Sequence, residues 1–184
     1  MRLPPGQRKT EKFPVLDLGI HPQVDLRKYR FRVWGAVRRP TEWNWEALQR
    51  LPMREVVRDF HCVTRWSRTG VRWRGIPTRV VLQKVEPEED ARYVLVHSLD
   101  GYTTNLLRED LEKEDVLLAL ELDGAPLTVE HGAPLRLVVP HLYGWKSAKW
   151  VSGMEFLREQ KLGYWEKRGY HWRGDPWREE RFAE

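Results

Sequence analysis

Alternating and continuous apolar segments along the chain predict many short strands. Residues 30–35 alternate polar and apolar positions with a period of two, as a half-buried strand does. Continuous apolar runs favour strands that are buried on both faces, and a turn residue or a proline bounds several of them. The further predicted strands are residues 55–60, 93–98, 116–122 before the Asp123-Gly124 turn, and 135–139 before Pro140.

Two short helices are predicted between these strands. Residues 45–51 form the first, which Pro52 stops, and residues 78–85 form the second, which begins after Pro77 and presents an apolar face. Short strands and short helices follow one another in no regular alternation. This order indicates an α+β fold, rich in mixed β-sheet, and not a doubly wound α/β fold.

The chain of 184 residues is long enough for one domain with its own core. Residues 1–12 are polar, contain proline and glycine, and predict an irregular arm; residues 13–184 form the single domain. The segment from Gly163 to Trp177 is too aromatic for a disordered tail. We therefore expect it to pack back onto the domain.

Composition favours a globular protein without a membrane span. The chain is 41% hydrophobic and 32% charged, and no apolar run approaches the roughly 20 residues of a spanning helix. The basic start of the chain is followed by no apolar segment and no small-residue cleavage site, so a cytoplasmic location is expected. The net charge of +5 would allow nucleic-acid binding, but 27 acidic residues are mixed with the basic ones, which disfavours it.

Cys62 is the single cysteine, so it cannot form an internal disulfide. It follows a predicted strand, and His61, Thr64 and Arg65 flank it, so nearby cations are expected to favour its thiolate. A thiolate is a soft metal ligand, although no second cysteine or closely spaced histidine completes a zinc site. Three alternatives to a metal ligand remain: a buried spectator, a nucleophile paired with a histidine, or an intermolecular thiol.

A second segment combines glycines with anion-binding side chains. Residues 131–150 carry His131, Arg136, Lys146, Ser147 and Lys149 around one predicted strand and the loop after it. Accessible backbone N–H groups, a planar guanidinium and lysine charges together suit a phosphate or a similar anion. The alternative is a solvated basic loop beside a hairpin.

Three motifs resemble the molybdopterin-binding oxidoreductase domain of the sulfite oxidase type, in its small stand-alone bacterial and archaeal branch. They are the segment from Cys62 to Ser67, the segment from His131 to Pro140, and the segment from Gly144 to Trp150. Weaker similarity extends from Phe13 to Leu157. The resemblance implies a mixed α+β fold around one molybdenum held by molybdopterin, with Cys62 as the protein ligand to the metal.

The resemblance also implies which residues hold the cofactor. His131 and Arg136 match positions that face the pterin and its phosphate. A segment near residues 15–18 matches one that closes over the cofactor. The other residues implied to bind the cofactor are Thr64, Ser98, Asp100, Lys146, Ser147 and Lys149.

The implied activity is a two-electron oxygen-atom transfer or reduction of a small or sulfur-containing substrate, with an external cytochrome, ferredoxin or similar redox partner. The chain has Leu16-Asp17-Leu18 and Arg65-Trp66-Ser67 where sulfite-oxidising members carry other residues, and the second pattern is closer to methionine sulfoxide reductase catalytic subunits. Rival hypotheses are a cofactor-free thiol enzyme and a nucleic-acid-binding domain. The candidates for the substrate pocket, for which packing or cofactor support is the alternative, are Arg65, Trp66, Tyr102 and Tyr143.

Overall fold

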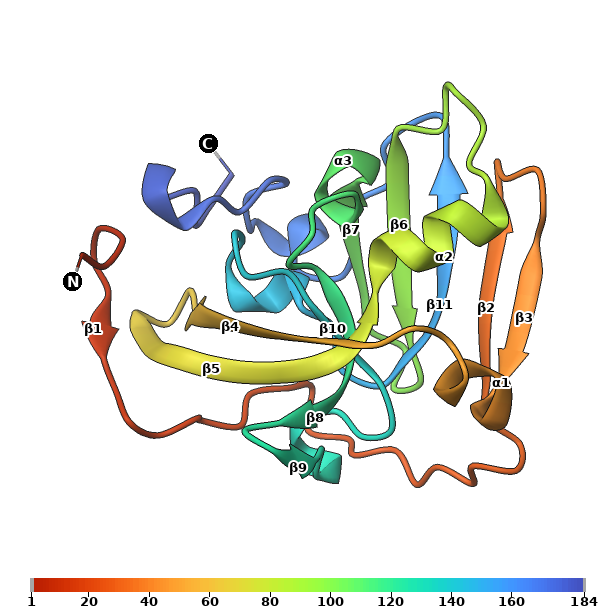
Figure 1. The fold of residues 1–184 in the computed structure, drawn as a ribbon. Helices are drawn as coiled ribbons and strands as arrows, with labels where there is room; N and C mark the ends of the chain where they lie inside the picture. The colour runs from red at the N-terminus through yellow and green to blue at the C-terminus, as the bar shows by residue number, and fades with distance from the viewer. Residues whose placement is uncertain (1, 184) are drawn as a thin grey trace.

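Two mixed β-sheets form the centre of the molecule, which a computed structural model describes over residues 2–183 (Figure 1). The first sheet follows the path β1-β5-β8-β10, with β4 paired to β5 and β9 paired to β8. Its strands are β1 (Arg8–Lys9), β4 (Arg54–His61), β5 (Trp66–Pro77), β8 (Leu117–Leu122), β9 (Ala125–Pro126) and β10 (Arg136–Val138). The second sheet has the order β3-β2-β11-β6-β7. Its strands are β2 (Arg30–Gly35), β3 (Thr41–Asn44), β6 (Tyr93–Ser98), β7 (Thr103–Leu107) and β11 (Val151–Leu157).

The helices are few and short, which confirms the predicted α+β fold with mixed sheets. They are α1 (Trp45–Gln49), α2 (Thr78–Val85) and α3 (Arg108–Leu111), with 3-10 turns η1 (Val129–His131), η2 (Gly144–Lys146), η3 (Glu166–Arg168) and η4 (Pro176–Arg178). The helix α2 has the bounds predicted for it, residues 78–85. The helix α1 ends at Gln49, two residues before the end predicted at Leu51. Asn44 caps its start, because its side-chain oxygen accepts the Ala47 N–H at 2.8 Å.

Several strands were not predicted, because their side chains mix apolar and charged residues or contain glycine. The longest is β5, in which arginines stand between the buried Val71, Trp73 and Gly75. The arm predicted over residues 1–12 is not wholly irregular, since β1 pairs in parallel with the start of β5. Both β1 and β11 join strands far away in sequence, which local patterns do not reveal.

The first sheet is buried on both faces where it reaches the middle of the molecule. In β8, Leu118 packs in the larger hydrophobic cluster, with α2 and the second sheet, while Leu117 and Ala119 pack in a smaller cluster. In β10, Leu137 and Val138 divide between the two clusters in the same way. The smaller cluster contains Phe60 and Trp73 and lies beside the site described below. Both faces of β10 are therefore fixed by packing.

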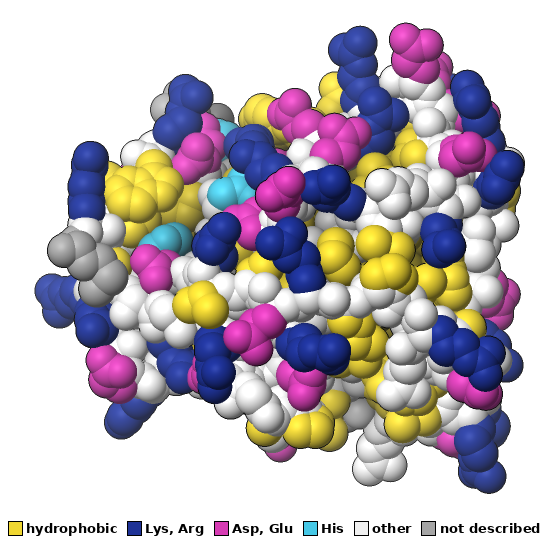
Figure 2. All heavy atoms as spheres, in the orientation of Figure 1, with side chains coloured by type: hydrophobic (Ala, Val, Ile, Leu, Met, Phe, Trp, Pro, Cys, Tyr) yellow, Lys and Arg dark blue, Asp and Glu magenta, His cyan; other side chains and the backbone are white. Residues whose placement is uncertain are grey.

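The two ends of the described chain lie near one another (Figure 1). The segment after Gly163 packs back onto the domain: the Trp172 carbonyl accepts a hydrogen bond from the Lys146 ammonium at 2.7 Å, and the Gly174 carbonyl accepts one from the Tyr143 N–H at 2.8 Å. Basic and acidic side chains are interspersed over the face shown in Figure 2. Within residues 2–183, no helix combines the length and the apolar character needed to cross a membrane.

Candidate active site

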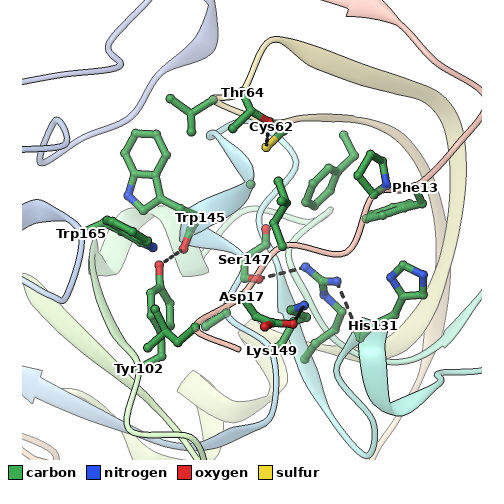
Figure 3. A pocket seen from close by; sticks show the side chains of 18 of the residues that line it. Phe13, Asp17, Cys62, Thr64, Tyr102, His131, Trp145, Ser147, Lys149 and Trp165 are labelled. Carbon is green, nitrogen blue, oxygen red and sulfur yellow. Dashed lines mark hydrogen bonds and ion pairs between the residues drawn. The ribbon is translucent and has the colours of Figure 1, made fainter. Parts of the chain in front are cut away.

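One cavity of about 260 Å³ brings the three sequence motifs together. Cys62 lies at one end in Figure 3, with Tyr102, Trp145 and Trp165 on one side and Phe13 and His131 on the other. The residues predicted to bind the cofactor that line this cavity are Cys62, Thr64, Asp100, His131, Arg136, Ser147 and Lys149. The predicted closing segment near residues 15–18 also lines it, through Leu16, Asp17 and Leu18, and so do the preceding Phe13 and Pro14.

A tight hairpin loop between β4 and β5 presents Cys62 to the cavity. The Cys62 N–H donates to the Trp66 carbonyl at 2.9 Å, and the Arg65 N–H donates back to the Cys62 carbonyl at 3.1 Å. Arg65 has a φ of 78°, a left-handed conformation that closes many hairpin loops of this length. Cys62 therefore stands at the base of a short turn between two paired strands, where its backbone has little freedom.

The Cys62 thiol is shielded from solvent, being 8% exposed. Its Sγ lies 3.0 Å from the Thr64 Oγ1. Burial raises the pKa of the Cys62 thiol, and the hydrogen bond with Thr64 and the charge of Arg181 offset this only in part. A nearby cation was expected to favour the thiolate, and Arg181 acts in that direction, but burial outweighs it. A buried neutral thiol is a poor free nucleophile, whereas a metal deprotonates the thiol that it binds.

No histidine ring activates this thiol through a hydrogen bond among residues 2–183. The neighbouring His61 places its Nδ1 2.7 Å from the Ser67 Oγ, and burial lowers the pKa of His61. The geometry thus lacks the thiol–histidine contact that a cysteine nucleophile requires.

Four residues form a surface that we call the cation wall: His131, Arg136, Ser147 and Lys149. Its centre is Arg136 in β10, which is 3% exposed and donates to the carbonyls of His131 at 3.1 Å and Ser147 at 2.9 Å. Its guanidinium carbon lies 5.1 Å from the centre of the Trp73 ring. In the described chain it has no carboxylate within ion-pair distance, and burial lowers its pKa.

Lys149 adds a second cation to this wall, and Asp17 partly neutralises it. The Lys149 ammonium lies 3.2 Å from the Asp17 Oδ2 and 2.9 Å from the Glu130 carbonyl. Burial and then Arg136 lower the pKa of Lys149, while Asp17 opposes them. Burial, Arg136 and Lys149 together lower the pKa of His131, which favours its neutral ring. Two cations and one carboxylate leave the wall positive.

Ser147 couples the two segments of the wall. Its Oγ accepts the Val139 N–H at 2.9 Å, next to β10, while its carbonyl accepts from Arg136. Asp100 lies at the border of the cavity and accepts the Tyr102 N–H at 3.1 Å. Burial raises the pKa of Asp100.

Two of the predicted cofactor-binding residues do not reach the cavity. Lys146 is fully buried behind it, 2.9 Å from the Glu166 Oε2, and it also donates to the carbonyl of Asn105 at 2.6 Å. Ser98 is buried outside the lining, and its Oγ has no partner among the described residues. Of the substrate-pocket candidates, Trp66 and Tyr102 line the cavity, while Arg65 and Tyr143 do not.

Four further side chains form what we call the aromatic wall: Tyr102, Trp145, Trp165 and Tyr170. The Tyr170 ring packs 4.8 Å from Trp145 and stacks 5.2 Å from Trp165, measured between ring centroids. The Tyr102 hydroxyl donates to the Trp145 carbonyl at 2.5 Å. The sequence analysis missed Trp165 and Tyr170 as site residues. The aromatic density of residues 163–177 was the signal that could have indicated them.

A family model described as the oxidoreductase molybdopterin binding domain matches residues 18–165. The chain therefore belongs to the molybdopterin-binding oxidoreductases, which confirms the resemblance to the sulfite oxidase type, and its cofactor is the molybdenum–molybdopterin of that family.

Its relatives agree with this family. The protein named uncharacterized oxidoreductase YuiH, from Bacillus subtilis, is 46% identical over 183 residues, which cover 99% of this chain and 92% of YuiH. The protein-methionine-sulfoxide reductase catalytic subunit MsrP of Campylobacter jejuni is 29% identical over 85% of this chain, which spans 58% of MsrP. The crystal structure of the sulfane dehydrogenase SoxCD from Paracoccus pantotrophus matches 76% of this chain and 40% of its own, with a TM-score of 0.68 and 22% identity. That likeness shows the fold.

The side chains of the cavity fit this cofactor. A buried guanidinium that bonds only neutral carbonyls is suited to an anionic phosphate, because the anion would supply the charge that Arg136 lacks. Residues 2–183 contain no group of three or more His, Cys, Asp or Glu side chains placed to hold a metal ion.

Proposed function

We propose that this protein transfers an oxygen atom to or from a small sulfur-containing substrate, with Cys62 as the protein ligand to the molybdenum. The observation that carries the proposal is the placement of one shielded thiol and an under-compensated guanidinium in the same cavity. When bound, the cofactor supplies two-electron redox chemistry and an exchangeable oxygen. The side chains of the protein orient the cofactor and exclude water around it.

The cation wall would hold the anionic part of the cofactor. Arg136 is fixed by β10 and by two carbonyls, so its charge needs little reorganisation on binding. His131 and Lys149 would add a ring and a point charge on the same side, with Ser147 joining the two segments. Lys146 is left out of this role because its ammonium is bonded to Glu166.

The aromatic wall would contribute to the substrate pocket. It lies across the cavity from His131 and Phe13 in Figure 3, and its exposed surface is formed by Tyr102, Trp145, Trp165 and Tyr170. Aromatic rings make favourable contacts with divalent sulfur, which suits a thioether group. MsrP is by its name a methionine sulfoxide reductase, and a thioether is the reduced form of a sulfoxide, which supports the proposal.

The two electrons of the reaction would pass one at a time to or from an external redox partner, such as a cytochrome or a ferredoxin. The net charge of +5 favours an acidic partner. A cytoplasmic location stays a prediction.

The test is to express the chain in a host that makes molybdenum cofactor and to measure molybdenum and released pterin per mole of protein. We expect near-stoichiometric pterin in the wild type and in Cys62→Ser, with the metal lost or its spectrum altered only in the variant. Val57→Ser, at an exposed position of the same β4 strand, is the matched control and should behave as wild type. Well-folded wild type without pterin would contradict the proposal, and unchanged metal spectra in Cys62→Ser would exclude Cys62 as the ligand.

A further inference from the structure

The loop that carries Cys62 is held by residues from both ends of the described chain. Gln7 places its amide nitrogen 3.0 Å from the Cys62 carbonyl, 2.9 Å from the Trp66 carbonyl and 3.0 Å from the Ser67 Oγ. Arg181 donates to the Val63 carbonyl at 2.6 Å. Four positions of the loop region, Cys62, Val63, Trp66 and Ser67, thus accept hydrogen bonds from two side chains that the fold alone brings to it.

Gln7 and Arg181 also bond to each other, which fixes the orientation of the amide. Arg181 donates to the Gln7 Oε1 at 2.8 Å and to the Pro5 carbonyl at 3.1 Å. A guanidinium only donates, so the amide oxygen must face Arg181 and the amide NH₂ must face the Cys62 loop. The NH₂ carries two hydrogens for three nearby acceptors, all of which belong to the loop or to the strand after it.

The Arg181 side chain that makes these contacts is buried and closely packed. Arg181 is 4% exposed, and its guanidinium carbon lies 5.0 Å from the centre of the Tyr143 ring. A Cβ atom added at Gly6, which has a φ of +74°, would come within 2.8 Å of the Arg181 Nη2 and of the Arg65 Nη1. A side chain at position 6 would be strained by the positive φ and would displace the ends of both arginine side chains, so the backbone before Gln7 packs closely against them.

The loop contains a strained residue that such support would hold in place. Arg65 adopts its left-handed φ without the freedom of a glycine, at a cost on the order of 1 kcal/mol. Its guanidinium lies 3.8 Å from Glu179, whose carboxylate also lies 3.4 Å from the Arg181 Nε. The conformation of the turn is thus tied to the same C-proximal segment.

We propose that Gln7 and Arg181 are positioning residues for Cys62, and that together they fix the direction in which its thiol enters the cavity. We call this pair the clamp. The proposal rests on the proposed function, because it assigns the clamp to the residue proposed as the molybdenum ligand. The clamp touches the backbone carbonyls of Cys62 and Val63 and leaves the thiol free.

The sharpest variant is Gln7→Glu, which keeps the shape of the side chain and its acceptor for Arg181 but has no N–H for the loop. Arg181→Lys keeps the charge, but an ammonium group lacks the planar guanidinium that donates to Val63, Pro5 and Gln7 together. Gln160→Glu makes the same chemical change at an exposed position and is the matched control. Since Glu at position 7 gains an ion pair with Arg181, we expect this variant to fold.

The first measurement is hydrogen–deuterium exchange of the cofactor-free proteins, peptide by peptide. We expect residues 61–67 to exchange about tenfold faster in Gln7→Glu, the factor for loss of one to two hydrogen bonds, with β6 unchanged. Arg181→Lys should show a smaller increase and Gln160→Glu none. Exchange of residues 61–67 at the wild-type rate would overturn the proposal. Faster exchange throughout the chain, including β6, would show that the clamp stabilises the whole fold and not the Cys62 loop in particular. That result would also overturn the proposal.

The second measurement is the electron paramagnetic resonance signal of the half-reduced metal in cofactor-loaded protein. We expect Gln7→Glu to keep its pterin, because the cation wall is untouched, and to give a shifted or heterogeneous signal. Pterin-replete Gln7→Glu with the wild-type signal overturns the positioning role alone. Wild type that holds no pterin overturns the proposed function and the positioning role together, so the two failures are distinguishable.

Discussion

Arg136 and Lys146 are both buried cations in the same segment of the chain, yet they lie in opposite electrostatic settings. Arg136 faces the cavity and bonds only to neutral carbonyls. Lys146 lies behind the aromatic wall and meets the Glu166 carboxylate at 2.9 Å, with both side chains fully buried. The same Glu166 oxygen accepts from the Trp145 Nε1 at 2.7 Å.

The difference indicates that Arg136 is available to bind a ligand, whereas Lys146 stabilises the fold. A buried charge without a counter-ion is costly, and an anionic ligand can offset that cost. A buried charge with its counter-ion is already compensated and offers little to a ligand. Lys146 instead ties the cavity to the C-proximal segment through the Trp172 carbonyl. Basic residues in one motif therefore need not share one role.

Breaking the compensated charge should produce the largest loss of stability. Lys146→Met would leave the Glu166 carboxylate buried without its cation, which we expect to lower the free energy of unfolding by about 3–5 kcal/mol. Urea unfolding of the cofactor-free protein measures this. The double variant Lys146→Met with Glu166→Leu should recover part of the loss, because no buried charge is left alone. A single variant as stable as wild type would contradict the comparison.

Removing the uncompensated charge should affect the ligand more than the fold. Arg136→Met keeps much of the packing on Trp73 and Phe60, so we expect the stability of the cofactor-free protein to be unchanged or higher. Release of pterin on dilution should become about 10- to 100-fold faster, the loss expected for charge-assisted hydrogen bonds. Time-resolved fluorescence of released pterin checks this. Pterin retention equal to that of wild type would show that the wall does not hold the anion.

A third buried charge, the Asp110 carboxylate, extends the comparison to the pH dependence of stability, because a histidine and an arginine contact it. Burial alone would raise the pKa of Asp110, but the hydrogen bond from His141 and the charge of Arg173 lower it below its usual 3.8. The Asp110 carboxylate lies 2.8 Å from the His141 Nε2 and 2.7 Å from the Arg173 Nη1. Because the folded-state pKa is the lower one, the stabilisation is complete above 3.8 and is lost as the pH falls through the folded value.

We therefore expect Asp110→Asn to be less stable than wild type at pH 7 by about 1–3 kcal/mol and to lose less stability on acidification below about pH 4. Thermal unfolding between pH 2 and pH 7 measures both. Asp90→Asn is the control, since Asp90 forms an exposed ion pair with Arg158, which is worth little. An acid dependence of Asp110→Asn as steep as that of wild type would contradict the assignment.

The sequence by itself determined some of the strands and helices, the family and the place of Cys62. Period-two alternation predicted β2, and an apolar face after Pro77 predicted α2, because these signals come from neighbouring residues. Cys62 was predicted to follow a strand, and it lies directly after β4. The three motifs also indicated the molybdopterin-binding family, which the family match confirms.

Only the tertiary structure decided which charges are compensated and what holds the Cys62 loop. Arg136 and Lys146 are equally basic in the sequence, but the partners of Lys146 come from Asn105, Glu166 and Trp172. The clamp joins residues 7 and 181, which no local pattern connects. Burial and pairing depend on which distant segments meet in space, and burial and pairing set the energy of a charge. For that reason the chemical types in the site could be predicted from the sequence, while their separate roles could not.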